Sequence, residues 1–218
     1  MGRCMEILNE NIIMKIDKRT IKSNLKLEHK QYEVFRSPIY VYKKLIDNYP
    51  EYFSGRILDP SAGDGRMIKY IIENKSNINN HKIIDIRVEE YDNWNNNGIL
   101  NILGKNNCII GDFLLEEIRE KYDSIITNPP FSLACHFVEK GLLYSDRVII
   151  LQKSSWIGTQ KRTIWFNNLK KLKQILVIPN RPKWELDGMD NINFDNSEYF
   201  WYIFENDYNG PIILDWLI

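Results

Sequence analysis

The chain has 218 residues, with 29 basic and 29 acidic side chains and 44% hydrophobic residues. This length fits one domain with a full-sized core and leaves little room for a second. Charged residues at 27% and aromatic residues at 12% exclude wholesale disorder. No apolar run approaches a transmembrane helix or a signal core. Three scattered cysteines, Cys4, Cys108 and Cys135, form no CxxC pair, so we expect a cytoplasmic protein with neither a disulfide framework nor a metal site.

The formal net charge of zero hides an uneven distribution of charge along the chain. Nine Lys and Arg residues and no Asp or Glu lie between Arg147 and Lys183. Between Glu185 and Ile218 there are eight acidic residues and no Lys or Arg. A long stretch without one carboxylate favours a surface that faces a polyanion, although any single basic residue could equally be a solvated side chain.

In chain order, residues 1–30 are polar with weak helical spacing, which predicts an N-terminal arm or a short helix before a single domain over 31–218. Ser37 is expected to cap a helix that starts at Pro38. Strands are then predicted at 56–59, 82–89, 108–110, 124–127, 147–151, 174–178 and 199–204, and helices at 66–73, 114–120, 133–143 and 164–172. This alternation predicts an α/β fold, a mostly parallel seven-stranded sheet with helices on both faces. The last two strands have no helical pattern between them, so we expect a terminal antiparallel hairpin.

A glycine loop, Asp59-Pro60-Ser61-Ala62-Gly63-Asp64-Gly65, follows the first predicted strand, where open α/β sheets bind ligands. Gly63 and Gly65 allow a tight turn and close approach of a ligand to the backbone. A pyrophosphate site would offer bare amides here, whereas Asp59 and Asp64 bring negative charge. The loop therefore favours a cationic ligand, and the sulfonium and α-ammonium of S-adenosylmethionine fit. A plain strand–turn–helix with glycines for geometry is the alternative.

Two further strand ends carry acids that suit a nucleoside cofactor. Glu89 is the predicted acceptor for the ribose hydroxyls, with Glu90 and Asp85 as competitors, or it is a surface carboxylate without a role. Asp112 is expected to accept a hydrogen bond from the exocyclic amine of the cofactor adenine, and Phe113 to pack on the ring. A simple Gly-Asp turn is the alternative there.

Asn128-Pro129-Pro130-Phe131 directly follows an apolar strand and is the strongest signal in the chain. The two prolines stiffen the loop and leave carbonyls free. The Asn128 amide oxygen and the Pro129 carbonyl can both accept hydrogen bonds from one amino group, which stabilises positive charge as an exocyclic amine attacks a sulfonium methyl. Phe131 offers a face for a base flipped out of a duplex. A Pro-Pro turn with a packed Phe is the alternative.

Together, the glycine loop over 59–65 and the tetrapeptide 128–131 resemble the S-adenosylmethionine-dependent amino-methyltransferases, specifically the DNA adenine N6 group, over about 33–205. The resemblance implies a Rossmann-like methyltransferase fold, S-adenosylmethionine as cofactor, and contacts from 32–45 to the methionine end of that cofactor. The cofactor-binding residues so predicted are Phe35, Pro38, Asp59, Pro60, Ser61, Ala62, Gly63, Gly65, Glu89, Asp112, Phe113 and Asn128. The stretch 181–202 resembles the final hairpin of small phage-type members. RNA adenine and protein glutamine methyltransferases share the tetrapeptide.

Typical members of that group also carry a separate target-recognition domain, and nothing in this chain is long enough to be one. We therefore expect recognition by the basic stretch 152–184, by the N-terminal arm or by a partner subunit, and a homodimer is open. Nucleic-acid contacts are predicted for Lys153, Trp156, Lys161, Arg162, Arg181 and Lys183, with helix packing as the alternative for each Trp. The expected substrate is adenine N6 in DNA, with no membrane partner. An RNA adenine methyltransferase or a non-catalytic nucleic-acid-binding subunit of the same fold are the alternatives.

Overall fold

The computed structural model describes residues 35–75, 77–85, 103–186, 189–194 and 196–218. For residues 35, 36, 79, 185, 186 and 189–194 it describes the backbone alone. The N-terminal arm predicted for residues 1–30 lies outside the described residues, so that prediction stays open.

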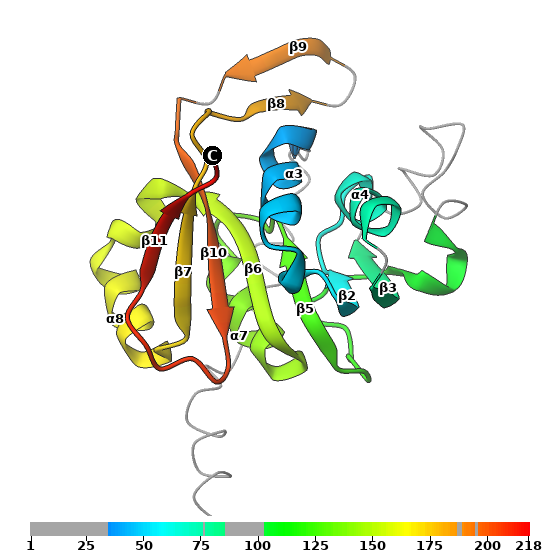
Figure 1. The fold of residues 1–218 in the computed structure, drawn as a ribbon, viewed down its shortest axis with the longest axis horizontal. Helices are drawn as coiled ribbons and strands as arrows, with labels where there is room; N and C mark the ends of the chain where they lie inside the picture. Colours follow the sequence, from blue (N-terminus) through cyan, green and yellow to red (C-terminus); the bar gives the residue numbers. More distant parts are fainter. Residues whose placement is uncertain (1–34, 76, 86–102, 187–188, 195) are drawn as a thin grey trace, which may run out of the picture. The chain divides into compact units, whose positions relative to one another are not determined.

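An eight-stranded sheet forms the centre of the described chain (Figure 1). Its strands, in order across the sheet, are β11 (Ile213–Trp216), β7 (Leu172–Val177), β10 (Tyr199–Glu205), β6 (Ser145–Lys153), β5 (Tyr122–Thr127), β2 (Gly55–Asp59), β3 (Ile78–Asp85) and β4 (Cys108–Ile110). Neighbouring strands are parallel except that β10 is antiparallel to both β6 and β7. The predicted α/β class is confirmed.

The antiparallel pairing predicted for the last two strands is confirmed, but its place in the sheet is different. Phe200 pairs with Val177 in β7, while Tyr202 on the same strand also pairs with Ile150 in β6. The strand β10 is therefore internal, which fits its four consecutive buried residues from Trp201 to Phe204, because a strand covered on both faces is apolar throughout. The strand at this edge of the sheet is β11, an eighth strand that is not among the predicted ones.

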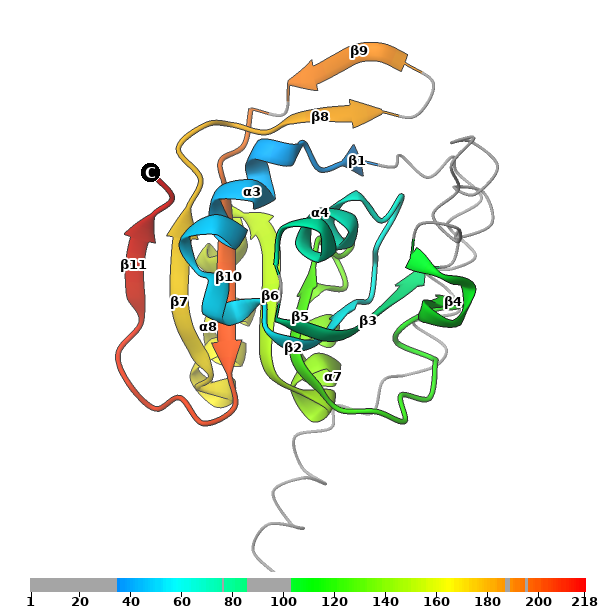
Figure 2. The same ribbon diagram turned by 45° about the vertical axis from the view of Figure 1, so that its right-hand side comes forward.

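Helices cover both faces of the sheet (Figure 2). The helices α3 (Ile39–Asn48) and α4 (Arg66–Asn74) lie on one face, and α7 (Ala134–Tyr144) and α8 (Gln160–Leu169) on the other. Short 3₁₀ turns are η1 (Pro50–Tyr52), η2 (Lys105–Asn107) and η3 (Ser154–Gly158). None of the described helices combines the length and apolarity needed to cross a bilayer.

Two local predictions about helices are wrong. Residues 114–120 form the end of a turn followed by irregular chain rather than a helix. Asp112 begins this turn, because its side chain accepts the Leu114 amide and its carbonyl accepts the amides of Leu115 and Glu116, but the turn does not continue into a helix. The cap of α3 is Pro38, with no side-chain hydrogen bond, and Ser37 lies one residue earlier.

A second, small sheet consists of β1 (Phe35–Arg36), β8 (Lys183–Leu186) and β9 (Met189–Phe194) in antiparallel pairing. Both ribbon views place it beyond the carboxyl ends of the parallel strands. The indole nitrogen of Trp201 in β10 donates to the carbonyl of Val41 at 2.9 Å. That buried bond fixes α3, whose N-terminus follows β1, against the centre of the large sheet.

Candidate active site

The two sequence motifs lie at the carboxyl ends of adjacent strands. The glycine loop follows β2, and Asn128 follows β5, its neighbour in the sheet. The loop needs its glycines for conformation, because Gly63 has a φ of 56° and Gly65, the N-cap of α4, has a φ of 71°. A Cβ built on Gly63 would meet no atom within 4 Å, so space is not what requires glycine there.

Ser61 and Thr127 connect the two motifs directly. Their hydroxyl oxygens share a short hydrogen bond, one residue before Asn128. Asp59, at the end of β2, is 1% exposed and accepts hydrogen bonds from Thr127 and from the Ser61 amide. Burial raises the pKa of this carboxyl to about 7, although the two hydrogen bonds lower it. The structure therefore brings the two predicted motifs together around one buried acid.

The sequence predicts that Asp59 and Asp64 both present negative charge to a ligand, but in the structure Asp64 is paired with a neighbouring cation. Asp64 pairs with Arg66, whose Nε lies 2.9 Å from one carboxylate oxygen. A further acid comes from β3, because Asp85 accepts a hydrogen bond from the Gly63 amide at 2.9 Å. Asp85 is also the last residue of β3 as the structure describes it. Glu89, the predicted ribose acceptor, lies outside the described residues, so its role stays a prediction.

Two hydrogen-bond acceptors of the tetrapeptide, the Asn128 side-chain oxygen and the Pro129 carbonyl, lie at this site. The Asn128 side-chain nitrogen donates to Ser37 Oγ at 3.2 Å. Its oxygen, Oδ1, is buried and has no hydrogen-bond partner among the described residues. The Pro129 carbonyl accepts from Gln152 Nε2 at 3.4 Å, and Gln152 is 1% exposed at the end of β6. Buried acceptors normally have donors, so the orphan Oδ1 indicates a place for one.

Phe131 forms one wall of the same region together with Tyr199. The two rings lie 5.9 Å apart, centre to centre, and tilted by 45°. The ammonium of Lys153 lies 5.3 Å from the Phe131 ring and 5.8 Å from the Tyr199 ring. Lys153 pairs with Tyr199 across β6 and β10, so the register of the sheet places this cation beside the tetrapeptide.

The remaining predicted cofactor residues take different positions. Pro38 is buried at the start of α3, and Phe35 is described only as the first residue of β1. Asp112 follows β4 and uses its side chain to hold the Leu114 amide at 2.8 Å. Phe113 is 1% exposed and packs on Phe137, with 5.2 Å between ring centres. Phe113 is thus a core residue in this structure.

Trp156, predicted to contact nucleic acid, lies inside an aromatic cluster. It is 2% exposed, and its ring centre is 4.9 Å from that of Tyr202 and 5.1 Å from that of Phe166. The neighbouring Arg162 turns inward and donates to the Trp156 carbonyl at 3.0 Å. Trp156 has no ring face free for stacking a base unless it leaves this cluster.

In the structure, several cations of the basic stretch form ion pairs with acids of the C-terminal stretch. Arg147 and Lys173 both pair with Glu205, at 2.7 Å and 2.9 Å, because β10 lies between β6 and β7. Arg181 pairs with Glu198 at 2.7 Å on the surface. The polyanion-facing surface expected over the whole basic stretch is therefore smaller than the sequence indicates.

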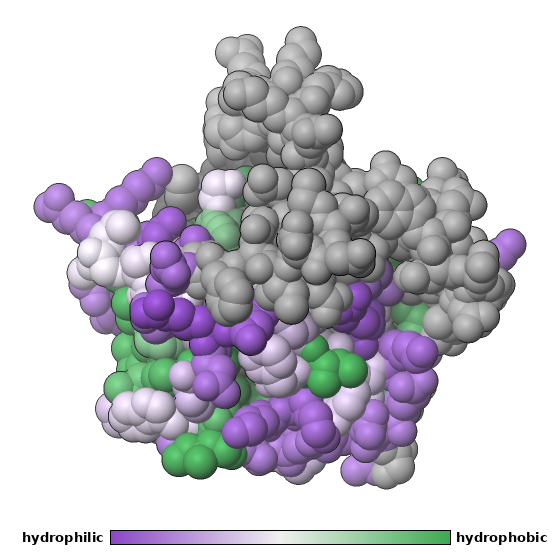
Figure 3. Space-filling model, turned by 90° about the horizontal axis from the view of Figure 1, so that it is seen from above, coloured by the Kyte–Doolittle hydropathy of each residue, from purple (hydrophilic) through white to green (hydrophobic). Residues whose placement is uncertain are grey.

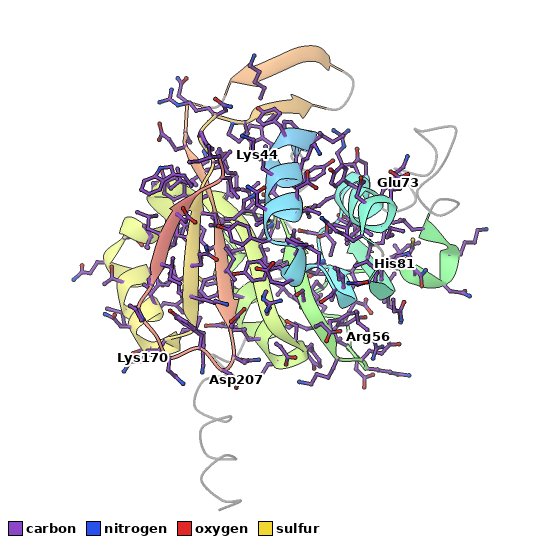
Figure 4. The ribbon with its side chains drawn as sticks, viewed as in Figure 1. Lys44, Arg56, Glu73, His81, Lys170 and Asp207 are labelled. Atoms are coloured by element: carbon purple, nitrogen blue, oxygen red, sulfur yellow. The ribbon has the colours of Figure 1, made fainter. Side chains whose placement is uncertain are left out.

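The exposed lysines of this stretch lie at opposite ends of the sheet. Lys161 is in the first turn of α8, shortly after the carboxyl end of β6, and Lys183 begins β8. Lys170 precedes β7, and Figure 4 shows it with Asp207 at the end away from the small sheet. Figure 3 looks onto the site end, where hydrophilic residues predominate among the described surface atoms and hydrophobic patches lie between them. No group of three or more His, Cys, Asp or Glu residues in the described chain is arranged to hold a metal.

Two residues at the site, Thr127 and Ser37, were not predicted for it. Gln152 lies in the stretch 152–184 that was expected to face the substrate, although its contact with Pro129 was not predicted. Thr127 could have been found as the polar end of β5. Ser37 carries no local signal for this role, because its contact with Asn128 spans 91 residues of sequence.

No family model and no curated protein sequence matches this chain. Among solved structures it is similar to a proposed class I S-adenosylmethionine-dependent methyltransferase from Listeria monocytogenes, with a TM-score of 0.56 and 15% identity. A type I restriction–modification methyltransferase subunit from Streptococcus thermophilus gives a TM-score of 0.60 at 11% identity. A proposed RNA methyltransferase from Pyrococcus horikoshii gives 0.59 at 16%.

These alignments cover 84%, 85% and 78% of this chain, respectively. They span 66% of the Listeria protein, 48% of the Streptococcus subunit and 85% of the Pyrococcus protein. At such identities the likeness concerns the fold, and the expectation of a Rossmann-like architecture is confirmed. The chain has the fold of S-adenosylmethionine-dependent methyltransferases.

Proposed function

We propose that the protein transfers a methyl group from S-adenosylmethionine to the exocyclic N6 amine of adenine in DNA. One observation carries the proposal. Asn128 Oδ1 is a buried acceptor without a donor among the described residues, next to the Pro129 carbonyl and beside the glycine loop. An orphan buried acceptor costs free energy of about 1–3 kcal/mol, and a ligand that supplies the donor would remove this cost.

The acceptor pair suits an amino group bonded to an aromatic ring. Such an amine is a poor nucleophile because its lone pair is delocalised into the ring. Asn128 Oδ1 and the Pro129 carbonyl would each accept one of its two N–H groups, which favours a pyramidal nitrogen and stabilises the positive charge that develops on it. The Pro129 carbonyl has two lone pairs, so the contact from Gln152 leaves one available. The methylated nitrogen then loses its proton to solvent.

The residues around the glycine loop fit S-adenosylmethionine as cofactor. When bound, it supplies a methyl group carried on a sulfonium. The buried Asp85 carboxylate holds the Gly63 amide and favours a cationic ligand over a phosphate, while Asp59, with its pKa raised to about 7, adds negative charge only above that pH. Asp85 or Glu89 would hold the ribose hydroxyls, and Asp112 the adenine amine. Pro38 and Phe35 would lie near the methionine end.

Nucleic acid is the substrate class that the aromatic wall and the nearby cations favour. Phe131 offers a ring for stacking a flipped base, and the Lys153 ammonium over that ring is placed to attract a nearby phosphate. The Streptococcus structure described as a type I restriction–modification subunit supports DNA. The Pyrococcus structure described as a proposed RNA methyltransferase keeps RNA as the second candidate. The basic stretch 152–184, the N-terminal arm or a partner subunit would contribute to recognition.

Transfer of a tritiated methyl group tests the proposal. The protein is incubated with labelled S-adenosylmethionine and with duplex DNA, single-stranded DNA or RNA, each with and without adenine. Adenine-dependent labelling of duplex DNA is expected, and Asn128→Ala should abolish most of it. Asn209→Ala, at an exposed asparagine between β10 and β11, is the matched control and should label like wild type.

Other outcomes separate the alternatives. Labelling of RNA alone would assign the RNA activity and overturn the DNA proposal. Nucleic-acid binding without any S-adenosylmethionine binding in calorimetry would assign a non-catalytic subunit. Equal labelling by wild type and Asn128→Ala would refute the role given to Asn128.

A further inference from the structure

Ser37 stands on a rigid part of the framework next to the tetrapeptide. Its hydroxyl oxygen accepts the hydrogen bond from Asn128 Nδ2 at 3.2 Å. The following residue is Pro38, which restricts the backbone of Ser37, and α3 begins directly afterwards. That helix is anchored by buried side chains, Val41 among them, and by the bond from the Trp201 indole to the Val41 carbonyl. Ser37 therefore reaches Asn128 from a fixed position.

The two acceptors of the site differ in how freely they can turn. The Pro129 carbonyl is part of a backbone stiffened by two prolines. The amide of Asn128 is attached through a terminal torsion with broad preferences, so its plane has to be set by neighbours. Among the described residues, Ser37 is the side chain that hydrogen-bonds this amide. With Nδ2 on Ser37, the amide plane is set and Oδ1 is the end that faces away from Ser37, without a partner.

We propose that Ser37 is a positioning residue that holds the Asn128 amide plane so that Oδ1 meets the substrate amine. This inference rests on the proposed methyl transfer. Ser37 acts through Asn128 and does not itself touch the reacting nitrogen. A hydroxyl can donate as well as accept, so threonine at this position would retain the contact, whereas alanine would remove it.

Steady-state kinetics at saturating nucleic acid and varied S-adenosylmethionine test the inference. Ser37→Ala is expected to lower kcat about 10-fold, the effect of losing one ordinary hydrogen bond, with the KM for S-adenosylmethionine unchanged. Ser37→Thr should restore kcat to within about 3-fold of wild type. Ser54→Ala, which lies between η1 and β2 at the other end of the sheet, is the matched control and should behave as wild type. A raised cofactor KM with unchanged kcat would make Ser37 a cofactor contact and overturn the proposal.

A double-mutant cycle with Asn128→Ala, measured in single turnovers, gives a readout that a purely structural role would not produce. If Ser37 works through Asn128, Ser37→Ala should cost nothing further once Asn128 is alanine. An equal loss in both backgrounds would overturn the inference while leaving the proposed function standing. If wild type methylates none of the nucleic acids, the proposed function fails, and the positioning role fails with it.

The hydrogen bond itself can be tested without turnover. The side-chain amide resonances of Asn128 are identified in ¹⁵N-labelled protein by their loss in Asn128→Ala. Ser37→Ala should shift these resonances, and Ser37→Thr should leave them near their wild-type positions. No shift in Ser37→Ala would show that the contact is not made, whatever the kinetics.

Discussion

The carboxylate of Asp85 accepts a hydrogen bond from the backbone amide of Gly63, with 2.9 Å between Oδ2 and the nitrogen. The adjacent amide of Ala62 donates to the carbonyl of Ile84 at 3.3 Å. Two consecutive amides of the glycine loop are therefore held by the end of β3. The left-handed backbone at Gly63 is stabilised from a strand that the sequence places more than twenty residues away.

Removing the Asp85 carboxyl should weaken cofactor binding because the loop loses this support. We expect Asp85→Ala to raise the Kd for S-adenosylmethionine about 10-fold or more, measured by calorimetry. Asp85→Asn keeps an oxygen acceptor for the Gly63 amide and should raise the Kd less. If Asp85→Ala binds as tightly as wild type, neither the bond nor the charge of Asp85 matters to the cofactor. If the two variants are equally weak, charge is the dominant contribution.

Stability should depend on pH through Asp59. Burial raises the pKa of its carboxyl to about 7 in the folded protein, above the value of about 3.9 for an unfolded chain. The folded state then binds a proton more tightly than the unfolded state. The contribution of this group to stability is fully present below the unfolded pKa and is lost as pH rises towards 7.

Urea unfolding at a series of pH values checks this sign. The free energy of unfolding of wild type, minus that of Asp59→Asn, should fall between about pH 4 and pH 7 and level off above. Asp207→Asn changes an exposed aspartate at the other end of the sheet, as Figure 4 shows, and should keep the wild-type profile. A difference between wild type and Asp59→Asn that rises with pH would contradict the assignment.

Patterns that act locally were readable from the sequence. The strand 108–110 was predicted with the bounds it has, and the glycine loop was expected at a ligand-binding strand end because open α/β sheets bind ligands there. The hydrophobic run after Asn209-Gly210-Pro211 forms β11, and although these turn residues precede it, no local pattern indicates that it pairs with β7. The turn that begins at Asp112 does not continue into the predicted helix, and no local pattern marks that stop.

Contacts between distant segments were not readable. The basic stretch and the acidic tail looked like two separate surfaces, but β10 enters the sheet between β6 and β7 and brings Glu205 to Arg147 and Lys173. The order of strands in a sheet depends on how the whole chain packs. The hydrophobic periodicity of single segments carries no information about that order. The Ser37 contact to Asn128 is hidden for the same reason.

Trp156 should matter to stability more than to nucleic acid. Trp156→Ala is expected to lower the free energy of unfolding by about 3–5 kcal/mol, because it empties the centre of the aromatic cluster. Trp156→Phe should cost less, since the indole nitrogen has no partner among the described residues and its loss breaks no hydrogen bond. The phenylalanine variant should bind DNA as wild type does in fluorescence anisotropy. A large loss of affinity in a folded Trp156→Phe would mean that the indole leaves the cluster to bind.

Gln152 should support turnover through the Pro129 carbonyl. Gln152→Leu keeps a similar volume but removes the donor 3.4 Å from that carbonyl. We expect kcat to fall several-fold, up to about 10-fold, with the Kd for S-adenosylmethionine unchanged, because the carbonyl loses a fixed partner. Gln160→Leu, at the exposed first residue of α8, is the control for the same chemical change. Unchanged turnover in Gln152→Leu would restrict Gln152 to packing.

Two lysines at the two ends of α8 test where nucleic acid binds. Lys161 lies at the carboxyl end of the sheet with the site, and Lys170 at the opposite end, and both are exposed. Lys161→Gln should weaken DNA binding at all sequences alike and reduce the slope of log K against log salt by about 1, because one phosphate contact is lost. Lys170→Gln should change neither quantity. Glutamine is chosen because Lys170 has a φ of 50°, a conformation that a β-branched residue would strain further. Equal losses of DNA affinity in the two variants would mean that the charge of the protein acts as a whole. A loss of affinity only in Lys170→Gln would place the nucleic acid at the wrong end of the sheet for the proposed chemistry.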